Sequence, residues 1–75
     1  MPDMTPMQRY EWATGPDGWL TPYGWERLAG DLDRVADGYG SGGMHDRYRD
    51  RAADCRSRRL RLIVAYQLTL PNNGY

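Results

Sequence analysis

The chain has 75 residues and a mass of 8.7 kDa, which limits it to one small domain and excludes Rossmann enzymes, barrel enzymes and repeat arrays. Its ten basic residues, all arginine, balance ten acidic residues, so the chain lacks the strongly basic balance of a dedicated nucleic-acid module. The single cysteine excludes an internal disulfide, and with one histidine it cannot complete a four-ligand zinc site.

The N-terminal part of the chain predicts an arm followed by a β-hairpin. Residues 1–7 contain two prolines and three methionines and are expected to form the arm. Residues 8–14 alternate, which places Tyr10, Trp12 and Thr14 on one face of a strand. Residues 15–18, Gly-Pro-Asp-Gly, have the composition of a turn, and residues 19–21 form a short second strand.

A helix is predicted over residues 22–37. Thr21 suits the N-cap, and Pro22 suits the first helical position. A stripe at helical spacing follows, and Gly38 is placed to end the helix. The stripe consists of Trp25, Leu28, Leu32, Val35 and Tyr39.

A glycine-rich joint at residues 38–43 leads to a second helix that is predicted to begin near Met44. Tyr48, Ala52 and Cys55 form a narrow stripe on it, and the small side chains allow close approach to the first helix. From residue 59 to residue 70 the apolar residues alternate with other residues, which predicts a strand. The alternative is that the second helix continues through residue 68.

These elements predict an α+β fold in one small domain over residues 8–71, with an arm at 1–7 and a C-terminal tail at 72–75. The order is an N-terminal β-hairpin, two helices and a long C-terminal strand. A helical hairpin with an N-terminal β-hairpin is the alternative. The open edges of the predicted sheet invite a homodimer or a partner strand.

Charge is divided unevenly along the chain. Residues 1–46 carry eight acids and three arginines, a net charge of −5, whereas residues 47–75 carry seven arginines and two acids, a net charge of +5. Such a division predicts either internal neutralisation or a charged face for a partner. The candidate contacts are Arg56, Arg58, Arg59 and Arg61, of which the last two have no acid nearby in sequence and are expected to be free.

Trp12 and Trp19, on the predicted β-hairpin, are candidate interface anchors, with a place in the core as the alternative. The segment 38–43 fits G-x-G-x-x-G, but a helix precedes it and no βαβ unit surrounds it, so no nucleotide or other cofactor is predicted. His45 and Cys55 lie about 15 Å apart along one helix, so no catalytic pair and no enzyme is predicted. The absence of a membrane span or signal peptide predicts a cytoplasmic protein.

Gln67-Leu68-Thr69-Leu70-Pro71 resembles the pentapeptide by which bacterial replication proteins bind the sliding clamp, with Thr69 as a departure from that pattern. The resemblance implies that Gln67, Leu68 and Leu70 would contact the clamp. Separately, a composition rich in arginine and glycine without lysine is typical of a GC-rich genome, such as that of an actinobacterium or its phage.

The function expected from the sequence is therefore that of a small, non-enzymatic interaction protein. It would be a phage-type accessory or regulatory factor that binds and modulates a host protein through the arginine-rich face, the hairpin aromatics or a sheet edge. A nucleic-acid-binding regulator that uses Arg47 to Arg61 is the first alternative, and it predicts an affinity that falls steeply with salt. A clamp-binding factor that uses residues 67–71 is the second.

Overall fold

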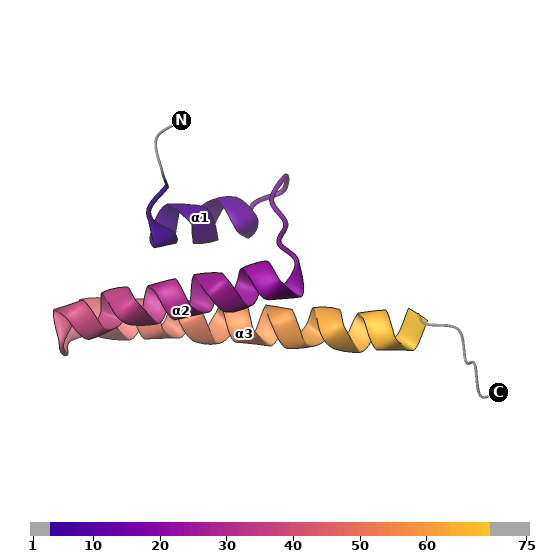
Figure 1. Cartoon of the computed structure of the whole chain (residues 1–75). Coiled ribbons are helices and arrows are strands. Elements are labelled where there is room, and N and C mark those ends of the chain that lie inside the picture. The colour runs from indigo at the N-terminus through magenta and orange to yellow at the C-terminus, as the bar shows by residue number, and fades with distance from the viewer. Residues whose placement is uncertain (1–3, 70–75) are drawn as a thin grey trace.

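The computed structural model describes residues 4–69 and consists there of three helices: α1 (Pro6–Ala13), α2 (Pro22–Tyr39) and α3 (Gly43–Thr69) (Figure 1). Helices α2 and α3 lie side by side and antiparallel, and α1 lies on the α2 side of this pair. No strand is present within residues 4–69. The predicted α+β fold is therefore wrong, and the sheet edge through which a homodimer was expected is absent from residues 4–69.

Helix α1 occupies the segment for which a β-hairpin was predicted. The Thr5 hydroxyl accepts a hydrogen bond from the Gln8 backbone N–H at 3.2 Å, and the Gln8 side chain accepts one from the Thr5 N–H at 2.9 Å. This capping box, with Pro6 at the first helical position, satisfies two of the free N–H groups of the first turn. The alternation over residues 8–14 does not produce a strand, because a helix also brings Tyr10 and Ala13, three residues apart, to the core.

The turn predicted at residues 15–18 is confirmed, although it joins two helices instead of two strands. The Gly18 N–H donates to the Gly15 carbonyl at 3.2 Å, with Pro16 and Asp17 in the central positions. A Cβ on Gly18 would lie 1.7 Å from the Trp12 carbonyl oxygen. Only glycine therefore allows the chain to return this close to the end of α1.

The prediction of a helix from residue 22 is confirmed, and α2 continues two residues beyond the predicted end at residue 37. The Thr21 hydroxyl accepts from the Gly24 N–H at 3.1 Å, which makes Thr21 the N-cap. Trp25, Leu28 and Leu32 of the predicted stripe are buried. Gly40, with a φ of 79°, ends the helix in a conformation that favours glycine.

Helix α3 begins at Gly43, close to the predicted start, and its buried residues Ala52 and Cys55 belong to the predicted narrow stripe. The strand predicted over residues 59–70 is wrong, because α3 continues to Thr69. No glycine or proline interrupts residues 44–69, and adding residues to an existing helix costs far less than starting a new element. The alternative of a continuous second helix is confirmed as far as Thr69, but the β-hairpin that accompanied it is wrong.

The register of the two long helices leaves the end of α3 without a neighbour from α2. Glu26 pairs with Arg59 at 2.9 Å and Asp37 pairs with Arg49 at 2.7 Å. This antiparallel register places Pro22, the first residue of α2, beside about residue 64 of α3. At 1.5 Å per residue, α3 is about 13 Å longer than α2. Figure 1 shows the last turns of α3 running past the start of α2. Residues 60–69, the final part of α3, are here named the α3 extension.

The core between the three helices is small. Four of the eight residues buried within the described part of the chain are alanine, which allows close helix packing but buries little apolar surface per residue. The other four buried residues have larger side chains. They are Trp25, Leu28, Leu32 and Cys55.

Candidate partner-binding site

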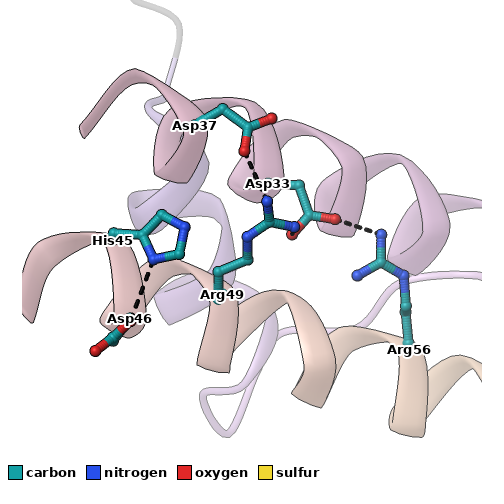
Figure 2. A network of polar contacts seen from close by, with 6 residues as sticks. All are labelled: Asp33, Asp37, His45, Asp46, Arg49 and Arg56. Atoms are coloured by element: carbon teal, nitrogen blue, oxygen red, sulfur yellow. Dashed lines mark hydrogen bonds and ion pairs between the residues drawn. The ribbon is translucent and has the colours of Figure 1, made fainter. Parts of the chain in front are cut away.

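Three of the seven arginines of α3, Arg49, Arg56 and Arg59, pair with acids of α2. Arg49 donates to Asp33 at 3.3 Å and to Asp37 at 2.7 Å, and Arg56 donates to Asp33 at 2.5 Å. Figure 2 shows these side chains reaching across the gap between the two helices. The charge division of the sequence is therefore partly an internal match between α2 and α3. Exposed pairs of this kind contribute little stability each, but they occupy the guanidinium groups.

Arg58 belongs to a second polar cluster, which connects α3 to α1. Its Nε donates to Asp54 at 2.8 Å, and the Tyr10 hydroxyl donates to the same carboxylate at 2.7 Å. Burial acts to raise the pKa of Asp54, but the hydrogen bonds from Arg58 and Tyr10 outweigh it and hold that pKa below its usual value. Burial, then the Asp54 hydrogen bond, raises the pKa of Tyr10 to about 12. The Arg58 guanidinium also lies 5.6 Å from the centre of the Trp25 ring.

The two arginines expected to be free differ in their surroundings. Arg59 pairs with Glu26 at 2.9 Å, so the expectation is wrong for Arg59. The acid comes from α2, 33 positions earlier in the chain, where no local pattern would reveal it. Arg61 forms no ion pair with any residue in the range 4–69, and among the α3 arginines it shares this property with Arg47.

Arg58 and Arg61 line an open groove beside the α3 extension, here named the Trp19 groove. Its volume is about 300 Å³. Trp19 is 69% exposed, so the groove presents an aromatic side chain to solvent beside a cation. The other lining residues come from the end of α1, the connecting turn, α2 and α3. They are Ala13, Gly18, Leu20, Trp25 and Leu62.

Leu62 was not singled out from the sequence, although a signal for it exists. It lies seven residues after Cys55, so it continues the buried stripe of α3 by two helical turns. The interpretation of residues 59–70 as a strand hid this continuation. Trp25, predicted as part of the helix stripe, also lines the groove.

Trp12 lies apart from Trp19, so the structure does not bring the two candidate anchors to one site. Trp12 lines a second groove of about 380 Å³ between α1 and the start of α2, and it is partly exposed. Leu20 is shared by the two grooves and is half-buried. The remaining residues of this second groove are Met4, Arg9, Gly24, Arg27 and Leu28.

The residues of the clamp-like pentapeptide lie at the end of α3. Gln67 and Leu68 are exposed on the helix, and Leu70 and Pro71 lie outside the described residues. The sliding-clamp interpretation stays a prediction.

Cys55 and His45, considered above as a catalytic pair, both lie on α3. Cys55 is buried, and this burial raises the pKa of its thiol to about 11. His45 lies near the start of α3, with its Nδ1 3.2 Å from Asp46 (Figure 2). Within residues 4–69, no three side chains of the metal-ligating types are grouped as a metal site requires.

None of the three helices described for residues 4–69 combines the length and the apolar character that crossing a membrane requires.

Comparison of the chain with protein-family models, with curated proteins and with solved structures finds no significant match.

Proposed function

We propose that this chain is a non-enzymatic interaction protein that binds a partner protein in the Trp19 groove. An apolar side chain of the partner would enter between Trp19 and Leu62, and a carboxylate beside it would pair with Arg61. The observation that carries the proposal is the position of Arg61. It lines an apolar groove without an ion pair to residues 4–69, whereas Arg58 and Arg59 are paired.

The composition of the groove supports a protein partner. Exposed tryptophan and arginine are the side chains most enriched among interface hot spots, and here they border the same groove. A planar guanidinium binds a carboxylate through two parallel hydrogen bonds, which gives the site a chemical preference. The accessory role in a phage, with a host protein as the partner, stays a prediction from composition.

The ion pairs of α3 weigh against the nucleic-acid alternative. Salt-dependent binding to nucleic acid requires several arginines to neutralise phosphates. Of the α3 arginines, only Arg47 and Arg61 lack an ion pair within residues 4–69. They stand 14 residues apart, about 21 Å along the helix axis. Two separated cations do not form a continuous phosphate track.

The full chain is first used as bait in a lysate of a GC-rich actinobacterium, with and without nuclease, and the captured protein is identified. That protein is then purified, and calorimetry measures its affinity for the wild-type chain and for each variant. We expect Trp19→Ala and Arg61→Glu each to weaken it by about 10-fold or more. Trp12→Ala and Arg47→Glu are matched controls, because they alter the same residue types outside the groove, and they should leave the affinity within about 3-fold.

Two results would contradict the proposal. One is capture that disappears with nuclease and falls steeply with salt, which would favour the nucleic-acid regulator. The other is equal affinity of the groove variants and their controls, which would place the contact elsewhere. Because Trp19 and Arg61 are largely exposed, their substitution is expected to leave the helices intact, and circular dichroism checks this.

A further inference from the structure

The second groove, between α1 and the start of α2, is here named the Trp12 groove. Its volume of about 380 Å³ lies at the lower end of the range for small-molecule sites. Trp12 is 47% exposed, whereas Trp19 is 69% exposed, so more of Trp12 is covered by its own chain. The other apolar side chains that line the groove are Met4, Leu20 and Leu28. Such a lining can cover the apolar body of a small ligand.

Positive charge borders the Trp12 groove. Of the residues in the range 4–69 that line it, two are arginines, Arg9 and Arg27, and none is acidic. Arg27 forms no ion pair with any residue in that range. Glu26, which precedes it, pairs with Arg59 of α3 at 2.9 Å. The groove therefore carries a cation that the described part of the chain does not neutralise.

Asp31, four residues after Arg27 on α2, is shared among other arginines. Its carboxylate accepts from Arg9 at 2.5 Å and also pairs with Arg34. Because residues four apart on a helix are neighbours, this one carboxylate stands among three guanidinium groups. The Nε of Arg9 is also buried, and it finds no hydrogen-bond acceptor among the described residues, so its N–H dipole is not offset. The surroundings of the groove therefore favour a negative charge.

Tyr23 orients the guanidinium of Arg27. The Arg27 Nη1 donates to the Tyr23 hydroxyl at 3.0 Å, and the Arg27 Cζ lies 5.8 Å from the centre of the Tyr23 ring. A guanidinium has further N–H donors, which this contact leaves for a ligand. Their planar arrangement matches the two oxygens of a carboxylate. One unpaired guanidinium balances a single negative charge, which favours a carboxylate over a doubly charged phosphate monoester.

We propose that the Trp12 groove binds a small aromatic carboxylate, with its ring against Trp12 and its carboxylate on Arg27. The indole of Trp12 offers a surface on which an aromatic ring stacks with an offset. The thioether of Met4, which lines the same groove, also makes favourable contacts with aromatic rings. This site is separate from the Trp19 groove, and it does not depend on the function proposed above.

The test uses cinnamate, which joins one aromatic ring to one carboxylate, and follows the backbone amide chemical shifts of the isotope-labelled full chain. Titration to about 10 mM is appropriate, because a ligand of this size is expected to bind with a Kd near ~1 mM. The amides of Trp12, Gly24 and Leu28 should shift most. Cinnamyl alcohol, which has the same ring without the charge, should bind about 5-fold more weakly.

Arg27→Gln is the main variant, because Arg27 is exposed and its replacement is expected to leave the helices intact. It should weaken cinnamate binding by about 5-fold and leave the affinity for cinnamyl alcohol unchanged, a difference that a merely structural role would not produce. Arg47→Gln is the matched control, since Arg47 is also exposed and lacks an ion pair within residues 4–69 but lies outside the groove. It should bind cinnamate as the wild-type chain does.

Three results would overturn the proposal: cinnamate shifts the amides around Trp19 instead, the alcohol binds as tightly as cinnamate, or Arg27→Gln and Arg47→Gln bind cinnamate equally. The two grooves are tested separately by their tryptophans. Trp12→Ala should lose cinnamate and keep the partner protein, whereas Trp19→Ala should lose the partner protein and keep cinnamate. Failure of one proposal is therefore visible without failure of the other.

Discussion

The two parts of α3 differ in what surrounds them. Residues 43–59 lie beside α2 and bury Ala52 and Cys55, while their outward surface carries arginines that pair with acids. The α3 extension, residues 60–69, is apolar on two sides and has no α2 residue opposite its last turns. A helix that is apolar over most of its circumference is normally buried. The first part therefore stabilises the packing of α2 on α3, whereas the second part leaves Leu60, Val64 and Leu68 exposed.

This contrast predicts that substitutions of the same kind differ in effect between the hairpin core and the α3 extension. The largest effect is expected from Leu32→Ala, because Leu32 is fully buried between α2 and α3. Removal of a buried leucine side chain costs about 3 kcal/mol. The core of a domain this small supplies only ~3–5 kcal/mol, so about 0–2 kcal/mol should remain, and circular dichroism should show unfolding at a much lower urea concentration than for the wild type. A cooperative urea transition with an unchanged midpoint would show that the core is misplaced.

An intermediate effect is expected from Asp31→Asn, which acts on the contact between α1 and α2. The carboxylate of Asp31 accepts from Arg9 at 2.5 Å and also pairs with Arg34. The hydrogen bond from Arg9 lowers the pKa of Asp31, although burial opposes this. Loss of these charge-assisted bonds should reduce the free energy of unfolding at pH 7 by about 2 kcal/mol in urea denaturation.

The same contact determines part of the acid sensitivity. Because the pKa of Asp31 is lower in the folded chain than in the unfolded chain, its stabilising effect is complete above the unfolded value of about 3.9. It is lost as the pH falls through the folded value. Asp31→Asn should therefore flatten the loss of stability below about pH 4. Asp17→Asn, which alters an exposed aspartate, is the control and should not change this slope.

The smallest effect on stability is expected from Leu68→Ala, measured by urea denaturation. Leu68 is 80% exposed, so the free energy of unfolding should change by less than about 0.5 kcal/mol. The comparison with Leu32→Ala separates the two parts of the molecule by the same chemical change. A loss as large as that of Leu32→Ala would show that the α3 extension packs within its own chain.

The sequence predicts the start of α2 closely, because the cap at Thr21 and the first part of the stripe are local signals. The end is less well predicted, since Gly38 lies inside the helix and Gly40 ends it. The same Thr-Pro signal occurs at Thr5 and Pro6, where it starts α1, although the alternation over residues 8–14 predicts a strand there. The end of α3 is hard to predict because an exposed helix that is apolar on two sides has no helical periodicity. Its alternation then resembles that of a strand.

The candidate site is less predictable than the fold. Trp19, Arg58 and Arg61 were all named from the sequence, but only the folded chain shows that they line one groove. Arg59 illustrates the difficulty, since its acidic partner Glu26 is local in space and distant in sequence. Whether an arginine is free depends on helix register, which side-chain patterns do not specify.

Amide hydrogen exchange along α3 tests most directly whether this helix has a packed part and an exposed part. We predict that residues 48–59 are strongly protected, because they pack against α2 and include the buried Ala52 and Cys55. Protection of residues 60–69 should be weak, because Leu60, Val64 and Leu68 are exposed there. The account would be contradicted if residues 60–69 were as protected as residues 48–59.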